Sequence, residues 1–170
     1  IAIALGIAAF TASTIWKDTY VVSDDVASRL DAATLLAAKR LLREPCNQTV
    51  AAQLVHGLER SAEYEAILAF VETSKKQCGD NDVLLPALFR AQLLSSDLPA
   101  AERTAGDLVE RFPEDPNVFG WRSEAREKLG NFAGAYADMV KALALFPEPR
   151  NVAAQVFYDT GRLATKAEKP

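Results

Sequence analysis

A repeat with a period of about 34 residues constrains the fold of this chain more than any other feature of its sequence. Two short stretches recur at that offset: Phe112-Pro113-Glu114 as Phe146-Pro147-Glu148, and Ser96-Asp97-Leu98 as Gly130-Asn131-Phe132. A fixed period of this length is typical of stacked supersecondary units. Each unit is predicted to contain a first helix, a tight turn, and a second helix that a proline ends.

Fainter copies of the unit precede these two. Ala66 lies 35 residues before Ala101 and is taken as its equivalent, and Cys78 stands where the later units have proline. Further upstream, residues 21–45 are predicted to form a linker and one capping helix that begins at Ser23 or Asp24. Its apolar residues recur at three- and four-residue steps and are expected on one face: Val26, Leu30, Ala33, Ala37 and Leu41.

This pattern resembles the tetratricopeptide repeat family, whose unit is a helical hairpin of about 34 residues. The best match is residues 116–149, through Phe119, Ser123, Gly130, Phe132, Ala135, Ala142, Leu143 and Pro147. Residues 82–115 match through Leu85, Leu88, Ala101 and Pro113, although Phe89 stands where the family prefers a small residue. Residues 47–81 match only in their second helix.

The resemblance implies an all-α fold, a right-handed α-solenoid of about three helical hairpins with flanking helices. The repeat region is expected over residues 46–149, and residues 150–170 are expected to be a C-terminal capping helix or the start of a fourth repeat. Stacked hairpins can bury the apolar sides that a lone hairpin would expose. Such a scaffold indicates little about function, because one fold serves many functions.

The first sixteen residues, from Ile1 to Trp16, carry no charged side chain. As a helix they would cover about 24 Å of a hydrocarbon layer about 30 Å thick. Residues 1–20 are therefore predicted to be a transmembrane anchor, with one missing turn expected upstream of Ile1. A secretory signal sequence and a buried core helix are the alternatives. The anchor residues are Ile1, Leu5, Phe10, Ile15 and Trp16.

The segment that follows the anchor is poor in cations. Lys17 is offset by Asp18, and no further Lys or Arg occurs before Arg29. A loop of this composition favours the outer side of a membrane. We therefore expect a single-pass protein of a bacterial inner membrane, with the repeat domain in the periplasm.

The two cysteines agree with that placement. Cys46 is expected just before the first helix of its unit and Cys78 just after the second, so the two sulfur atoms lie at the same end of an antiparallel hairpin. A disulfide there would close a loop of about 33 residues and stabilise the fold by roughly 4 kcal/mol. It would fit an oxidising compartment. Two buried free thiols are the alternative.

No stretch of the sequence has the pattern of a catalytic or cofactor site. A net charge of -4 provides no cationic field for a nucleic acid. His56 is the one histidine, it has no serine or carboxylate motif beside it, and it is interpreted as packed or solvated. Phosphate loops, nucleophile elbows and zinc-ligand spacing do not occur. We therefore predict no enzyme activity, cofactor, metal, nucleic acid or small-molecule substrate.

Members of the family generally bind partners on the concave surface lined by the first helix of each unit. Projected onto this chain, that surface includes Gln48, Ala51, Val55, Val83, Pro86, Arg90, Leu93, Asn117, Gly120, Glu124 and Glu127. The predicted partner-binding residues are Val83, Arg90, Asn117, Trp121, Arg122, Glu124 and Arg126. Trp121 and the arginines could anchor an acidic or aromatic partner segment. Alternatively, Trp121 packs between repeats and the arginines stay solvated. The set contains no lysine and a single asparagine, so it lacks the clamp of lysines and asparagines with which some members bind chaperone tails.

These features predict a non-catalytic protein-protein interaction module, the membrane-anchored accessory or assembly subunit of a membrane or envelope complex, with other protein subunits as partners. The alternative is the regulatory region of a longer envelope enzyme, such as a hydrolase or protease, that continues beyond Pro170. A cytosolic adaptor is a third possibility, and it requires the first segment to be a core helix.

Overall fold

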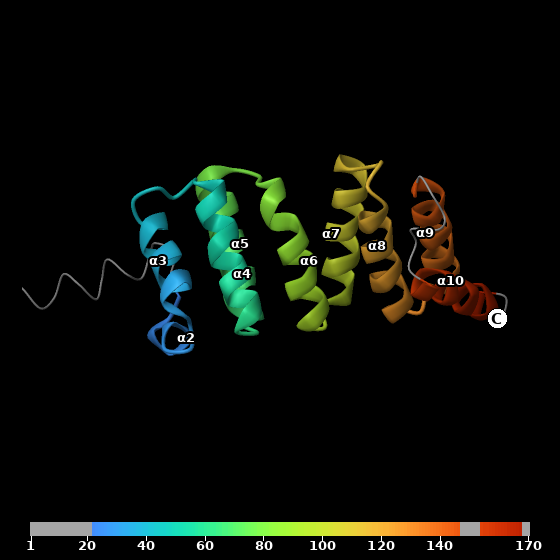
Figure 1. The fold of residues 1–170 in the computed structure, drawn as a ribbon, viewed down its shortest axis with the longest axis horizontal. Coiled ribbons are helices and arrows are strands. Elements are labelled where there is room, and N and C mark those ends of the chain that lie inside the picture. Colours follow the sequence, from blue (N-terminus) through green and yellow to red (C-terminus); the bar gives the residue numbers. More distant parts are fainter. Residues whose placement is uncertain (1–21, 147–153, 168–170) are drawn as a thin grey trace, which may run out of the picture. The chain divides into compact units, whose positions relative to one another are not determined.

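The computed structural model describes residues 22–146 and 154–167, and the regular structure of these residues is helical throughout (Figure 1). The elements are α2 (Asp24–Ala27), α3 (Ala32–Leu41), α4 (Gln48–Arg60), α5 (Tyr64–Cys78), the 3₁₀ helix η1 (Asp82–Leu84), α6 (Leu85–Leu94), α7 (Leu98–Arg111), α8 (Pro116–Lys128), α9 (Phe132–Leu145) and α10 (Ala154–Ala167). The predicted all-α class is confirmed for this part of the chain.

The predicted transmembrane anchor, residues 1–20, lies outside the described residues. Within the described ranges, none of the helices combines the length and the apolar character that crossing a bilayer requires.

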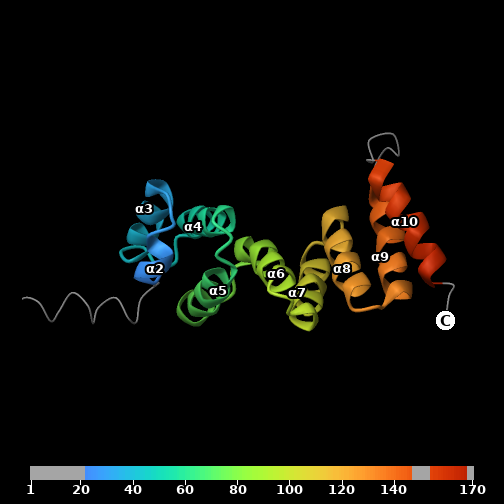
Figure 2. The ribbon, with the colours of Figure 1, turned by 90° about the horizontal axis from the view of Figure 1, so that it is seen from below.

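The chain divides into two compact units, of which the first ends at Ala87 and the second begins at Leu88. The boundary falls inside α6. In unit 1, α3 packs on α4 and α4 packs on α5 (Figure 2). The largest side chains buried in this unit come from these three helices and η1: Leu41, Leu54, Leu58, Ile67 and Leu84.

The capping segment of unit 1 contains two helices where the sequence predicted one. Ser23 caps α2, as expected, through a bond from the Val26 backbone N–H to its hydroxyl. The chain then breaks, because the Asp31 carboxylate accepts the Thr34 N–H at 2.7 Å and begins α3. Because a new helix begins after Asp31, its buried face differs from the expected one: Thr34 is buried, whereas Ala33, which was expected on the apolar face, is exposed.

In unit 2, α8 packs against both α7 and α9, and α10 packs against α9 (Figure 2). The core of unit 2 contains both small and large apolar side chains. The fully buried side chains include Phe89, Ala91, Ala101, Ala105, Leu108, Val118, Ala125, Ala135 and Leu163.

The turn between the two helices of each hairpin recurs at a constant interval along the chain. A left-handed backbone occurs at Ala62, Ser96 and Gly130, with φ of 57°, 64° and 81°. At each site the next residue donates its N–H to a carbonyl five residues back: Glu63 to Leu58, Asp97 to Gln92, and Asn131 to Arg126. This is the hydrogen-bond pattern of a Schellman motif, which closes the end of a helix. The described hairpins are therefore α4–α5, α6–α7 and α8–α9, a helical repeat-like architecture.

The same period governs the start of each first helix. The capping residues Asn47, Asn81 and Asp115 are separated by the same interval as the turns, and each accepts a backbone N–H with its side chain. This register aligns Ala101 with Ile67, which is fully buried, whereas Ala66 is half-buried. The sequence alignment of residues 47–81 was therefore wrong by one residue, because Ile67 and not Ala66 corresponds to Ala101.

Candidate functional site

Unit 2 contains a groove between α8 and α10, to which α9 also contributes. Its volume is about 610 Å³. Its lining residues come from all three helices: Gly120, Ser123, Glu124, Glu127, Lys128, Phe132, Met139, Asp159, Arg162, Leu163 and Lys166. We call this the unit 2 groove. Its volume lies in the range of ligand-binding clefts in proteins.

Both polar and apolar side chains line the unit 2 groove. Carboxylates and cations occur in equal number, since Glu124, Glu127 and Asp159 are matched by Lys128, Arg162 and Lys166. Apolar surface comes from Phe132 and Met139, which are half-buried, and from Leu163, which is 1% exposed. A lining of this kind can bury apolar side chains of a ligand while a few polar groups orient it.

Glu127 joins α8 to α10 at one part of the groove. Its carboxylate accepts hydrogen bonds from both terminal nitrogens of Arg162, one of them at 2.8 Å, and from the Lys166 ammonium at 2.9 Å. The Arg162 guanidinium, and secondarily the Lys166 ammonium, lower the pKa of Glu127 from 4.5 to about 2. Lys166 also lies 5.0 Å from the centre of the Phe132 ring.

A second cluster lies deeper in unit 2 and is centred on Asp138, a residue of α9 that is 3% exposed. Arg122 donates to both of its carboxylate oxygens, at 3.0 and 2.6 Å, and Arg126 donates to one at 2.8 Å. Arg126 also donates to Glu102 of α7 at 2.9 Å. The cluster thus connects three consecutive helices. We call it the Asp138 cluster.

Two of the predicted partner-binding residues therefore have partners inside unit 2. Arg122 and Arg126 pair with Asp138, and their role in binding a partner stays a prediction. Trp121 stacks on Phe89, with ring centres 5.9 Å apart and planes inclined by 22°. This contact gives a packing role to the bulky Phe89.

The remaining predicted residues lie in different surroundings. Glu124 is exposed and lines the unit 2 groove. Asn117 is exposed in the first turn of α8, where its side chain bonds Asp115 at 2.8 Å. Arg90 is half-buried on α6, and Val83 is 49% exposed on η1 of unit 1. Of the residues that the sequence placed on the concave surface, Gly120, Glu124 and Glu127 line the unit 2 groove.

Sequence reasoning missed Asp138, although a signal for it exists. Asp138 lies three residues after Ala135 and four before Ala142, both of which were assigned to the hairpin match and are buried. Positions at these spacings share one helix face. A carboxylate on the buried face requires a cationic partner, and Arg122 and Arg126, one turn apart on the preceding helix, supply two.

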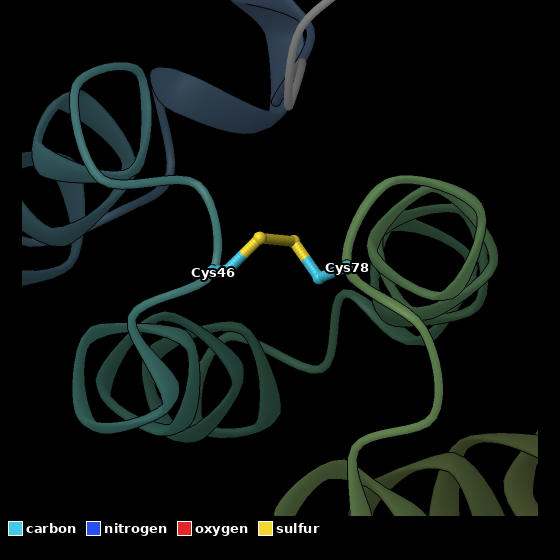
Figure 3. The surroundings of a disulfide bond; sticks show 2 residues. All are labelled: Cys46 and Cys78. Atoms are coloured by element: carbon cyan, nitrogen blue, oxygen red, sulfur yellow. A yellow bond between two sulfur atoms is a disulfide. The ribbon is translucent and has the colours of Figure 1, made fainter.

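In unit 1, the structure joins Cys46 and Cys78 in the disulfide that the sequence predicted (Figure 3). Their Cα atoms are 5.5 Å apart. Cys46 lies in the exposed loop before α4, and Cys78 is the last residue of α5. The bond therefore closes the open end of the α4–α5 hairpin, opposite the turn at Ala62.

His56 lies on the surface of α4, where its ring Nδ1 is 3.3 Å from a carboxylate oxygen of Glu59, and its side chain is 67% exposed. Of the two environments predicted for His56, packed or solvated, the structure shows the solvated one. Among the described residues, no group of three or more His, Cys, Asp and Glu side chains is placed to hold a metal ion.

Comparison with known proteins assigns neither a family nor a function to the chain. The chain matches no protein-family model, and no curated protein matches it.

Proposed function

We propose that this protein is a non-catalytic interaction module built from tetratricopeptide-like repeats. In this proposal residues 1–20 anchor it in a membrane, and the repeat domain is an accessory or assembly subunit of a membrane or envelope complex. Its partners are other protein subunits.

The unit 2 groove is the observation that carries this proposal. It has a volume of about 610 Å³ and a lining that mixes apolar surface with paired and exposed charges. A groove lined in this way suits a peptide segment better than a small apolar molecule, because a segment presents alternating polar and apolar side chains along its length. The regular recurrence of caps and left-handed turns supports the repeat assignment.

The disulfide supports a location outside the reducing cytosol, because such bonds persist in oxidising compartments. Together with the uncharged segment from Ile1 to Trp16, it favours the periplasmic side of a bacterial inner membrane.

Co-purification from detergent-solubilised native membranes tests the proposal, with partners identified by mass spectrometry. The full chain should retain a defined set of proteins. Glu124→Arg should lose at least one of them, because it reverses an exposed charge that lines the groove. Glu110→Arg is the matched control, since Glu110 is exposed on α7 and does not line the groove. A chain without residues 1–16 shows which partners need the anchor. Recovery of no stable partner by the full chain would reject the proposal.

A second candidate function is the regulatory region of a longer envelope enzyme. The exposed aromatic side chains of α10 favour it, since Phe157 is 48% and Tyr158 66% exposed. A following helix of the same chain would cover such a surface. The complete open reading frame decides between the candidates, because a stop codon soon after residue 170 removes the second.

A further inference from the structure

We infer that the outer face of α3 docks on the surface of the membrane in which the chain is anchored, and that it prefers anionic lipid headgroups. This inference rests on the membrane anchor of the proposed function. It adds a second contact with the membrane, made by a folded part of the repeat domain. The outer face is defined by Leu35, Leu36, Lys39, Arg40, Leu42 and Arg43.

The two sides of α3 have different surroundings. Thr34, Ala37 and Leu41 are buried on the side that packs on α4. On the other side, Leu36 is 59% exposed and Leu42 is 39% exposed. Large apolar side chains exposed together on one face indicate a binding surface more often than a solvated one.

Leu42 and the half-buried Leu35 border an apolar hollow between α2 and α3. Its volume is about 160 Å³, and most of its lining is aliphatic: Val22, Asp24, Ala27, Leu35, Ala38, Lys39 and Leu42. The outer face therefore presents leucines around a recess that can receive part of a lipid chain.

Cations surround this apolar surface. Lys39 and Arg40 lie three and four residues after Leu36 and share its side of the helix, and Arg43 follows after less than another turn. All three are exposed. Long cationic side chains at the edge of an apolar face are typical of helices that lie in a membrane interface, where the charged ends reach the headgroups.

Two of the nearby carboxylates pair with cations outside this face, whereas Asp24, which lines the hollow, is exposed. Asp31 pairs with Arg60 of α4 at 2.7 Å, and Asp25 pairs with Arg29 at 2.9 Å. Glu44 is 3.8 Å from Arg40, and both side chains are about half exposed. Such an exposed pair is weak and exchanges readily for a lipid phosphate. The charge that remains at the end of α3 is positive.

The length of chain before α2 brings this face close to the bilayer. Seven residues, 17–23, separate Trp16 from α2. An extended chain spans at most about 3.5 Å per residue, so α2 begins within about 25 Å of the membrane surface. The tether keeps α3 near lipid at a high effective concentration. A weak apolar and electrostatic attraction is then sufficient for docking.

The test uses the full chain in lipid nanodiscs that contain a nitroxide-labelled lipid. The nitroxide accelerates the relaxation of methyl groups close to it. In nanodiscs with phosphatidylglycerol, the Leu36 and Leu42 methyl signals should relax much faster than those of Val140, a side chain of unit 2 that is 42% exposed. In nanodiscs of phosphatidylcholine alone, the difference should shrink.

Lys39→Gln with Arg43→Gln should lower the ratio of docked to undocked chain about 25-fold, about fivefold for each cation. Lys141→Gln is the control, since Lys141 is exposed on α9. Leu36→Ser should also reduce docking, and because the side chain is exposed, the thermal midpoint should be unchanged.

Alkaline extraction of the chain from the nanodisc lipids separates the docking inference from the proposal of a membrane anchor. A chain that resists extraction, but whose Leu36 relaxes no faster than Val140, overturns the docking inference and leaves the anchor in place. The outer face would then be a site for a protein. A chain that alkali releases refutes the anchor and, with it, the premise of docking.

Discussion

The same left-handed turn position is occupied by three different residues, Ala62, Ser96 and Gly130. Glycine adopts this conformation without steric conflict, whereas an L-residue with a Cβ atom pays about 1–2 kcal/mol. The fold therefore tolerates strain at two of its three turns. The tertiary contacts of the hairpins must supply that energy.

Ala62→Gly and Ser96→Gly should each stabilise the protein by about 0.5–1 kcal/mol, because the relief of strain exceeds the entropy that glycine adds to the unfolded chain. Gly130→Ala should destabilise it by a similar amount or more. Urea unfolding followed by circular dichroism measures all three. Destabilisation by either glycine substitution would show that the turn strain has been overstated.

Gly57 marks a close approach between α4 and α3. A Cβ atom there would lie 2.0 Å from the hydroxyl oxygen of Thr34, a side chain that is 2% exposed and bonded to Asp31. A buried, hydrogen-bonded side chain cannot move aside easily. A glycine at this point therefore serves packing.

Gly57→Ala should destabilise unit 1 by about 1–3 kcal/mol, the usual range for overpacking. Gly106→Ala is the matched control, since Gly106 is also inside a helix but a Cβ atom there meets nothing within 4 Å. That control should be neutral or stabilising by up to about 1 kcal/mol. Equal effects of the two substitutions in thermal unfolding would argue against the close approach.

At the scale of the helices, charged side chains as well as apolar ones connect the helices of unit 2. The Asp138 cluster links α7, α8 and α9 through Glu102, Arg122 and Arg126, and Ser123 donates its buried hydroxyl to the Ala135 carbonyl at 2.8 Å. Such contacts are directional. They therefore specify the packing register of these helices as well as their association.

Asp138→Asn should destabilise unit 2 by about 3 kcal/mol, because it leaves the half-buried Arg122 without a carboxylate and leaves Arg126 with Glu102 alone. The control is Glu72→Gln, which breaks the exposed pair with Lys76 and should change stability by less than about 1 kcal/mol. Hydrogen exchange of α8 and α9 amides provides the measurement. An Asp138→Asn protein with unchanged exchange would show that the cluster is dispensable.

The attachment of α10 should depend on pH. The pKa of Glu127 is about 2 in the folded protein against 4.5 ordinarily, because the Arg162 guanidinium stabilises the carboxylate. A group with a depressed pKa contributes its full stability above pH 4.5 and loses it as the pH falls toward 2.

Acid titration should therefore increase the hydrogen exchange of α10 between pH 4.5 and 2, after correction for intrinsic rates. Glu127→Gln should have faster exchange already at pH 7 and a smaller change over the same interval. Glu65→Gln is the control, since Glu65 is exposed on α5 of unit 1. Parallel pH profiles for the native and Glu127→Gln chains would refute the assignment.

At the scale of the whole molecule, the disulfide distinguishes one unit from the other. It closes the α4–α5 hairpin, and α5 lacks a side-chain cap at Glu63, whereas Asp97 and Asn131 cap the corresponding helices α7 and α9. A covalent link raises the stability of a hairpin that local signals specify poorly.

Replacing both Cys46 and Cys78 by Ser should lower the stability of unit 1 by about 2–4 kcal/mol. Hydrogen exchange resolved by residue should show the loss in α4 and α5, and amides of α8 and α9 should be unaffected. Uniform loss across the two units would mean that the chain unfolds as one cooperative block.

Much of the fold was predictable because its signals are local. The caps at Asn47, Asn81 and Asp115 act on backbone groups two or three residues away, and proline and turn residues act within one helical turn. The break at Asp31 was missed because its aspartate lies inside a continuous apolar pattern. The position of Ala66 was wrong by one residue because a single small side chain does not fix a register.

The candidate site was less predictable, because its contacts join residues that are distant in sequence. Glu124 was predicted as a groove residue from the resemblance alone. The pairing of Arg122 with Asp138 spans 16 residues, and that of Arg162 with Glu127 spans 35. The sequence shows the charge of such side chains but not their partners.

By itself, the sequence determined the helical class, the repeat period and the cysteine pair, since each follows from local backbone preferences and from the repeat that they generate. Only the tertiary structure decided that two arginines pair with a buried aspartate, that Trp121 stacks on Phe89, and that one face of α3 stays exposed. These outcomes depend on which helix faces meet, and that is settled by the packing of side chains far apart in the chain.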